Sequence, residues 1–366
     1  MAARLSLTLS SYFGRRFLAG VTLILCVLVG LVVVVDFVEL SRRAANRESA
    51  PLSVIIELAV LRIPFMAQKI LPFAVLFGGM LTFARLTRSH ELVVTRAAGV
   101  SVWQFLTPPL VVATLLGTFV MTVFNPISSA MVYRFEQIEA KHIRGKPSLL
   151  AVSPSGLWLR EGGADEQVVI HALGVSQQGL ELRDVIIFNY EGNDRFAGRI
   201  DADTASLASG RWRLDNALVS QPDLPTEHFA EYYLETELTI DSIRESFAAP
   251  ESVSFWALPG FIEALEEAGF SAVRHRLHWN AILSSPLLLY AMVLIAATFS
   301  LRLIRQGKAG LVVVGGLITG FLLYFLSDVV FALGLSGSIP VVMAAWTPAT
   351  VSTLLGLAMT LHLEDG

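Results

Sequence analysis

Long apolar segments on both sides of a polar stretch constrain this 366-residue chain more than any other feature. A hydrocarbon core about 30 Å thick requires about 20 apolar residues per membrane-spanning helix. Five segments of about this length or more contain no Asp, Glu, Lys or Arg: 17–35, 97–133, 277–301, 309–327 and 329–363. The polar stretch lies between the second and the third of them.

A sixth segment, 63–84, contains Lys69 and two prolines, and we count it because the orientation of the other segments requires it. The sequence therefore predicts a polytopic α-helical membrane protein with six transmembrane helices. Their expected limits are about 17–40, 63–84, 101–125, 279–301, 310–331 and 341–362.

Composition supports a membrane protein. Hydrophobic residues make up 54% of the chain and charged residues only 16%, whereas charged residues are about a quarter of an average soluble domain. A soluble enzyme is therefore excluded, and transport or membrane anchoring remains. The lone cysteine, Cys26, lies in the first apolar segment, so no intrachain disulfide can form.

Basic residues indicate the orientation, because Lys and Arg concentrate in short cytoplasmic loops. With six crossings, three basic clusters fall on one side of the membrane: Arg4, Arg15 and Arg16; Arg85, Arg88 and Arg96; Arg302, Arg305 and Lys308. Both termini are therefore expected in the cytoplasm and the polar stretch on the opposite side. A cleaved signal peptide over 15–50 is the alternative, but its apolar run is too long and no small-residue cleavage site follows.

The polar stretch reads as a β domain over 134–250. Short, partly alternating runs are separated by turn residues, which is typical of an antiparallel sandwich or barrel. The expected strands are 156–160, 167–172, 182–190, 195–202, 211–219 and 228–240. Helical spacing over 255–269 then leads back to the membrane.

A short helix is predicted between the second and third spans, within 85–101. Ser89 is the expected N-cap, Glu91 lies in the first turn where the helix dipole favours an anion, and Gly99 ends the helix. On a helical wheel, Val93, Val94, Ala97 and Ala98 share the arc expected at the membrane interface. The opposite arc holds Glu91, Thr95 and Arg96 with Leu92 among them and is expected to face the cytosol. Docking surface and plain connector are both open readings of this helix.

Sequence motifs for chemistry are missing. No phosphate-binding G-x-x-x-x-G-K-[ST] motif occurs, the seven histidines form no metal-ligand set, and there is no G-x-S-x-G motif or credible carboxylate pair. We therefore expect no catalytic residue, no metal and no cofactor, and an energy source outside this chain.

Several strings together resemble the lipopolysaccharide export permeases of Gram-negative bacteria, the LptF/LptG family, and its LptG branch more than its LptF branch. They are Tyr12-Phe13-Gly14-Arg15, residues 70–79 (ILPFAVLFGG), residues 89–94 (SHELVV) followed by Ala98-Gly99, Ser338-Ile339-Pro340 and Trp346-Thr347-Pro348. The resemblance covers nearly the whole chain.

This resemblance implies a fold and a function. The fold has transmembrane helices 1–3 with a cytosolic coupling helix at 85–100 (1–133), an inserted periplasmic β-jellyroll (134–250), and a linker helix with transmembrane helices 4–6 (251–366). The protein is then an ABC transporter permease of the bacterial inner membrane that extracts lipopolysaccharide and passes it to a periplasmic bridge. The implied partners are an LptF-like permease, an LptB-like ATPase dimer and a single-span LptC-like protein.

Candidate site residues follow from the resemblance and from their charge. The coupling helix implies ATPase contacts at Arg88, Ser89, Glu91 and Leu92. Arg42 and Arg43 align with a basic pair that contacts lipid phosphates in the family, with Arg47 close by; pairing with Glu39 and Glu48 is the alternative.

Four ionisable residues lie in or near spans, where such a group faces a cavity or partner or anchors at the interface: Asp36, Glu39, Lys69 and Asp328. Candidate residues for the jellyroll interior are Trp158, Val169, Ile187, Phe196, Trp212 and Tyr233, and ordinary core packing explains each of them equally well.

Two rival functions remain open on the sequence alone. A lipoprotein-releasing or macrolide-type permease usually has four spans, with the large domain after the first, which does not match the order found here. A membrane-anchored scaffold without transport activity would not need a docking helix.

Overall fold

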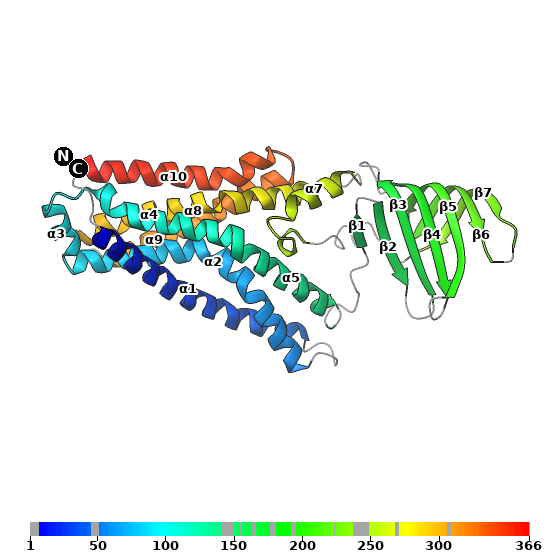
Figure 1. Cartoon of the computed structure of the whole chain (residues 1–366), viewed down its shortest axis with the longest axis horizontal. Helices are drawn as coiled ribbons and strands as arrows, with labels where there is room; N and C mark the ends of the chain where they lie inside the picture. Colours follow the sequence, from blue (N-terminus) through cyan, green and yellow to red (C-terminus); the bar gives the residue numbers. More distant parts are fainter. Residues whose placement is uncertain are drawn as a thin grey trace. The chain divides into compact units, whose positions relative to one another are not determined.

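The computed structural model contains the expected long helices and an inserted β domain (Figure 1). It describes residues 7–44, 51–140, 142, 150–153, 156–162, 166–175, 181–191, 195–208, 210–222, 224–236, 249–267, 271–305 and 309–365. The chain divides into two compact units. Unit 1 comprises 1–143, 254–256 and 276–366, and unit 2 comprises 144–253 and 257–275.

Six helices in the described part of the chain are long and apolar enough to cross a membrane, as predicted. They are α1 (Leu7–Ala44), α2 (Leu52–Arg88), α4 (Val102–Phe119) continued by η1 and α5, α8 (Val273–Arg305), α9 (Ala309–Leu335) and α10 (Val341–Asp365). Most extend well beyond the apolar segments because a helix continues through the headgroup region into water. In the most apolar 18-residue stretch of α2 and of α8, 56% of the stretch is buried, whereas the buried share is 11% in α1 and 17% in α9. Unit 1 is therefore built around α2 and α8, while α1 and α9 offer most of their surface to lipid or partner helices.

A close backbone crossing joins α1 to α2. A Cβ atom on Gly78 would lie 2.6 Å from the Cα of Val21, and one on Gly20 would lie 2.9 Å from the Gly78 carbonyl oxygen. The two glycines therefore let the helix backbones touch, which is how small residues promote helix packing in membranes. Phe17 and Phe83 stack beside this crossing with ring centroids 6.4 Å apart.

The third span contains a π-helical turn, η1 (Val120–Phe124), before α5 (Asn125–Glu139). Pro126 explains it, because a proline ring clashes with the carbonyl four residues earlier, here that of Thr122. The wider turn leaves the Thr122 carbonyl free of that clash, and the indole N–H of Trp256 donates to it at 3.0 Å. The backbone N–H of Phe255 donates to Oδ1 of the buried Asn125 at 2.7 Å. Residues 254–256 are thus bound to the span at its π turn.

Unit 2 carries one antiparallel sheet of seven strands in the order β1 to β7, each paired with the next along the chain. The strands are β1 (Leu150–Ser153), β2 (Gly156–Gly162), β3 (Glu166–Val175), β4 (Glu181–Glu191), β5 (Arg195–Ala208), β6 (Arg211–Ser220) and β7 (Glu227–Glu235). An inserted β domain is thereby confirmed, and its connectivity is a simple meander. Helix α7 (Leu258–Glu267) follows, within the helical segment predicted at 255–269.

Two residues with unusual backbone conformations, one in β4 and one in β6, interrupt the regular strand pairing of this sheet. Asp184 in β4 and Asn216 in β6 have left-handed backbones, with φ of 50° and 53°, a conformation that Asp and Asn tolerate better than most residues. Strand register places both opposite Asp203 of β5, and the Asn216 amide donates to the Asp203 carboxylate at 2.9 Å. Such irregularities bend strands, and they allow one long meander to curl around its own core, in which Trp212 is fully buried.

Candidate functional site

The helix between the second and third spans is short and begins with an unusual residue. Helix α3 (Glu91–Ala97) has His90 as its N-cap, in a left-handed conformation with φ of 57° and no side-chain capping bond. The expected Ser89 N-cap is therefore wrong. Ser89 instead ends α2, and its hydroxyl donates to the Leu86 carbonyl and to Glu91. The predicted end at Gly99 is confirmed by its φ of 86°, directly after the C-cap residue.

Glu91 is held by two side-chain hydrogen bonds. The Tyr12 hydroxyl donates to Oε2 at 2.9 Å, and the Ser89 hydroxyl donates to Oε1 at 2.8 Å. Arg88 is exposed and has no side-chain partner among the described residues. The structure thus brings Ser89 and Glu91 together and adds Tyr12, which the sequence reasoning missed because it lies 79 residues away.

The predicted exposure of Leu92 on α3 is wrong. Leu92 was expected on the cytosolic face, but it is only 4% exposed and packs in the main apolar core of unit 1. Val93 and Val94, expected at the membrane interface, are 59% and 67% exposed. Leu92 therefore turns this two-turn helix toward the core of unit 1, and Val93 and Val94 lie on its exposed surface. The exposed surface of α3 consists of Val93, Val94, Arg96 and Ala97, with Glu91 half-buried at its start.

A second cluster of charges lies at the far end of α1. Arg42 binds Glu39 at 2.8 Å and keeps 76% of its side chain exposed. Arg43 also binds Glu39, at 2.9 Å, and its guanidinium lies 3.8 Å from Glu139, a carboxylate of α5 whose side chain is only 6% exposed. The two neighbouring arginines therefore have different surroundings: Arg43 connects α1 to α5, and Arg42 faces outward. Arg47 lies outside the described residues.

Asp36 pairs with Arg62 of α2, whose guanidinium also lies 5.5 Å from the ring centroid of Phe135. The sequence reasoning missed Arg62 because it stands just before the predicted second span. Both partners lie the same number of residues from the Gly20–Gly78 crossing of the antiparallel helices, and this spacing could have identified the pair. Asp36 thus has a partner within the chain, which lowers the cost of a charge in a span.

Lys69 and Asp328 are exposed, and neither has a hydrogen bond or ion pair with another described residue. Lys69 lies near the middle of α2, and Asp328 lies two turns before the end of α9. Asp328 therefore lies inside the fifth long helix and does not end it.

The candidate residues for the β-domain interior fall on both faces of the sheet. Ile187 and Trp212 are fully buried in its core. Trp158 is 38% exposed and lies against His171, with ring centroids 4.2 Å apart, on the face opposite its buried neighbours Leu157 and Leu159. The expected inward orientation of Trp158 is therefore wrong, because the strand alternation places odd-numbered residues of β2 inside.

Three further candidates also lie outside this core. Phe196 and Tyr233 are 44% and 53% exposed, and Val169 alternates with the buried Ile170. The Tyr233 hydroxyl donates to Glu231 at 2.9 Å, and this hydrogen bond raises the pKa of Tyr233. These residues belong to the outer surface of the β domain.

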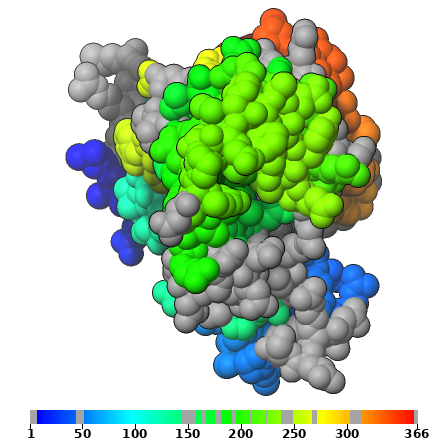
Figure 2. Space-filling model, turned by 90° about the vertical axis from the view of Figure 1, so that its right-hand side faces the viewer, coloured from blue at the N-terminus to red at the C-terminus, as the bar shows by residue number. Residues whose placement is uncertain are grey.

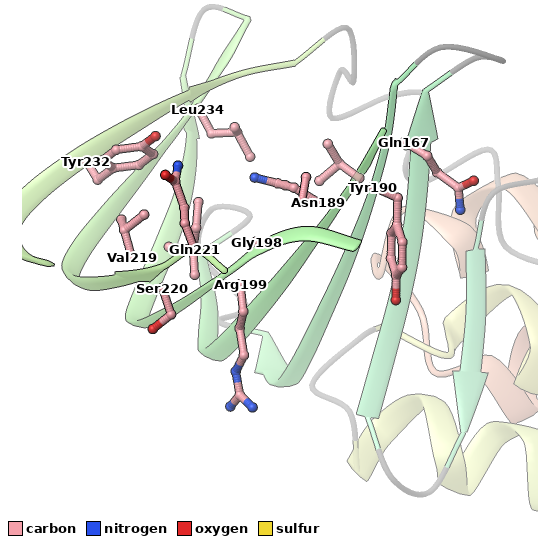
Figure 3. Close-up of a pocket in the computed structure, with 13 residues that line it drawn as sticks. Gln167, Asn189, Tyr190, Gly198, Arg199, Val219, Ser220, Gln221, Tyr232 and Leu234 are labelled. Carbon is pink, nitrogen blue, oxygen red and sulfur yellow. The ribbon is translucent and has the colours of Figure 1, made fainter. Parts of the chain in front are cut away.

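A cavity of about 240 Å³ opens beside the β-domain core and is lined by residues of β3 to β7 and of the turn after β6 (Figure 3). Its wall joins apolar residues that pack on the core, such as Val219 and Leu234, to the polar side chains of Asn189, Arg199 and Gln221. Hydrogen bonds from Arg199 to Asp201 raise the pKa of this arginine and hold its charge at the rim. The interior of the curled sheet thus has a mixed polar opening that the sequence did not predict. In the space-filling view of Figure 2, atoms of the β domain, in green, face the viewer.

A metal site is not apparent in the part of the chain that the structure describes, where no three His, Cys, Asp or Glu side chains cluster. The arrangement offers two short charged surfaces at opposite ends of long helices and an apolar β interior.

Comparison with known proteins agrees with this architecture. The family model described as lipopolysaccharide export system permease LptF/LptG matches residues 11–362. The lipopolysaccharide export system permease protein LptG of Haemophilus influenzae is 26% identical over 354 residues, covering 93% of this chain and 95% of the relative. The LptG protein of Escherichia coli is 25% identical over 355 residues, covering 95% of this chain and 96% of the relative.

Proposed function

Because the chain belongs to the LptF/LptG family of lipopolysaccharide export system permeases, we propose that it forms half of a transporter driven by a separate ATPase chain. It is an inner-membrane permease subunit of lipopolysaccharide export. The family match over residues 11–362, together with six apolar helices and an inserted β domain, carries this conclusion. The proposed companions are an LptF-like permease, an LptB-like ATPase dimer and a single-span LptC-like protein.

The proposed orientation has both termini in the cytoplasm and the β domain in the periplasm. Positive charges support it, because Arg15 and Arg16 near the start of α1 lie at the same end of unit 1 as Arg88 and Arg96 around α3 (Figure 1). Short loops rich in arginine remain on the cytoplasmic side. Helix α3 then faces the ATPase, and the Arg42 end of α1 lies at the outer leaflet.

Lipopolysaccharide extraction demands an apolar path. Each acyl methylene exposed to water costs about 0.8 kcal/mol, so a lipid with several chains cannot be wetted along its whole length. The curled sheet supplies an apolar interior around Ile187 and Trp212 for these chains. We propose that the lipid passes from the membrane through this interior to the periplasmic bridge.

The exposed Arg42 is the proposed contact for the lipid phosphates. Arginine binds phosphate with two parallel hydrogen bonds, and the side chain is 76% exposed at the outer end of α1. Glu39 binds both Arg42 and Arg43, so it keeps Arg43 as a partner when Arg42 binds a phosphate instead. Arg43 serves instead as a tie to Glu139.

ATPase coupling is assigned to α3. Glu91 is half-buried at the helix start and offers a carboxylate for a cation of the ATPase, while Val93 and Val94 offer exposed apolar contacts. Leu92 supports this surface from inside the permease core and makes no contact of its own with the partner.

Reconstitution tests the function. A tagged chain is purified from its host membranes, its companions are identified by mass spectrometry, and the complex is placed in proteoliposomes with lipopolysaccharide and a soluble acceptor protein. We expect an ATPase with a phosphate-binding loop and ATP-dependent transfer of lipopolysaccharide to the acceptor. Glu91→Lys should abolish ATPase co-purification without preventing membrane insertion.

Glu227→Lys, the same charge change at an exposed position of β7, is the matched control and should co-purify normally. A purified chain without an ATPase, or an ATPase that remains bound to the Glu91→Lys variant, would contradict the proposal.

A further inference from the structure

One hydrogen bond connects the start of the first span to the coupling helix. The Tyr12 hydroxyl donates to Oε2 of Glu91 at 2.9 Å, and the Ser89 hydroxyl donates to Oε1 at 2.8 Å. Each oxygen of the carboxylate therefore has its own side-chain donor. Two such bonds from two different helices restrict the rotation of a glutamate that would otherwise sample several rotamers in water.

Tyr12 itself is held firmly. Its ring meets Phe13 edge to face at 5.8 Å between centroids, and Phe13 is only 2% exposed and packs near Phe105. The Arg16 guanidinium lies 5.2 Å from the centroid of the Tyr12 ring. The cation–π contact helps to fix the ring, and the hydrogen bond that its hydroxyl donates to a carboxylate is stronger than one between neutral groups.

The backbone of Glu91 is fixed on its other side. Leu92 is inserted in the core of unit 1, and the Thr95 hydroxyl donates to the Glu91 carbonyl at 2.7 Å. The carboxylate is thus placed between a rigid phenol of α1 and a helix start that cannot rotate. Helix α1 is continuous from Leu7 to Ala44, so the same helix carries Tyr12 at one end and Arg42 at the other.

We propose that Tyr12 is a positioning residue, which holds the Glu91 carboxylate in the orientation that engages the ATPase and ties α1 to α3. This inference rests on the proposed coupling role of Glu91. A displacement of α3 on ATP binding is then passed directly to the helix whose outer end meets the lipid.

A double-mutant cycle tests this role in the complete reconstituted complex. Tyr12→Phe, Glu91→Ala and the double variant are compared by the affinity of the permease for its ATPase and by lipopolysaccharide transferred per ATP hydrolysed. Tyr12→Phe should weaken association on the order of tenfold, since it removes a hydrogen bond to a charged group, and should lower the transfer ratio. In the Glu91→Ala background the same change should have no further effect.

Two controls separate positioning from folding. Tyr133→Phe removes a hydroxyl from a 53% exposed ring that has no hydrogen-bond partner among the described residues, and it should behave as wild type. The melting temperature of the Tyr12→Phe permease should match that of this control. Ser89→Ala, which removes the second donor, should weaken association in the same direction.

Three results would overturn the inference. Tyr12→Phe could leave both association and transfer ratio unchanged while Glu91→Ala impairs them, which refutes positioning alone and leaves the proposed function standing. The effects of Tyr12→Phe and Glu91→Ala could add in the double variant, which assigns Tyr12 an independent structural role. Full association of Glu91→Ala would refute the coupling role and the inference together.

Discussion

Single residues differ in role even when they are adjacent, as Arg42 and Arg43 demonstrate. Arg43→Ala should lower the free energy of unfolding by about 1 kcal/mol, because it removes a cation near the buried Glu139 while solvent still screens the pair. Arg42→Ala should leave stability within about 0.5 kcal/mol, because the side chain is mostly exposed. Melting curves in detergent measure the first effect.

Lipid contact should be stronger at position 42 than at position 43, the reverse of the order of their effects on stability. A photocrosslinker at position 42 should capture lipopolysaccharide, and one at position 43 should capture less. Equal melting losses for both variants, with capture only at position 43, would contradict this division between the two arginines.

The Asp36–Arg62 pair gives a prediction about intramembrane charge. Asp36→Asn or Arg62→Gln alone should destabilise the permease by roughly 3 kcal/mol, because each leaves a charge without its partner in a partly buried site. The double variant should recover part of that loss, and the recovered fraction measures the coupling between them. Asp328→Asn is the control, since Asp328 is exposed and has no partner within the described residues. Additive losses in the double variant would show that the two charges act separately.

Helix packing is decided at the element scale by the Gly20–Gly78 crossing. Gly78→Ala should destabilise the fold by about 2 kcal/mol, because the new Cβ meets backbone atoms of α1 that cannot move aside. Gly30→Ala on the partner helix α1 is the control, since its Cβ would meet nothing within 4 Å, and it should be neutral or gain up to about 1 kcal/mol from helix propensity. Thermal unfolding and protein level in membranes give both values. Similar losses in the two variants would mean that the helices do not cross here.

The elements were predictable to the extent that local patterns determine them. Uninterrupted apolar composition identified five of the six spans, the orientation of the basic residues added the second span, which contains Lys69, and turn residues separated β2 to β7. Strand β1 was missed because its four residues carry no clear alternation. The π turn was missed because its cause is a local clash between Pro126 and the Thr122 carbonyl, and the periodicity of apolar residues does not reveal backbone clashes. Periodicity also could not show that Leu92 packs in the core of unit 1, because that contact depends on tertiary structure.

Site residues were predictable only where a motif carried them. The resemblance pointed to Glu91 and to the arginine pair. It could not indicate that Tyr12 donates to Glu91 or that Arg62 pairs with Asp36, because these contacts join segments distant in the chain. The six proposed β-domain residues divided between the two faces of the sheet because they were chosen for apolar or aromatic character, whereas the alternation along each strand decides which face a residue takes.

At the scale of the whole molecule, orientation in the membrane can be tested with the single cysteine. Cys26 lies within the apolar part of α1, so Cys26→Ala provides a background in which one new cysteine reports one position. Trp158→Cys lies on the outer surface of the β domain and Val94→Cys on the exposed face of α3. A maleimide that cannot cross membranes, added to cells with a permeabilised outer membrane, should label Trp158→Cys rapidly.

The same reagent should label Val94→Cys only after the inner membrane is disrupted, because α3 faces the cytoplasm in the proposed orientation. The native Cys26 should react slowly in both conditions, since a thiol in the apolar part of α1 meets little of a reagent that cannot enter the membrane. Labelling of Val94→Cys in cells with an intact inner membrane would show that the orientation is the opposite of the one proposed. It would also move Arg42 to the cytoplasmic leaflet and remove the basis for its contact with lipid phosphates.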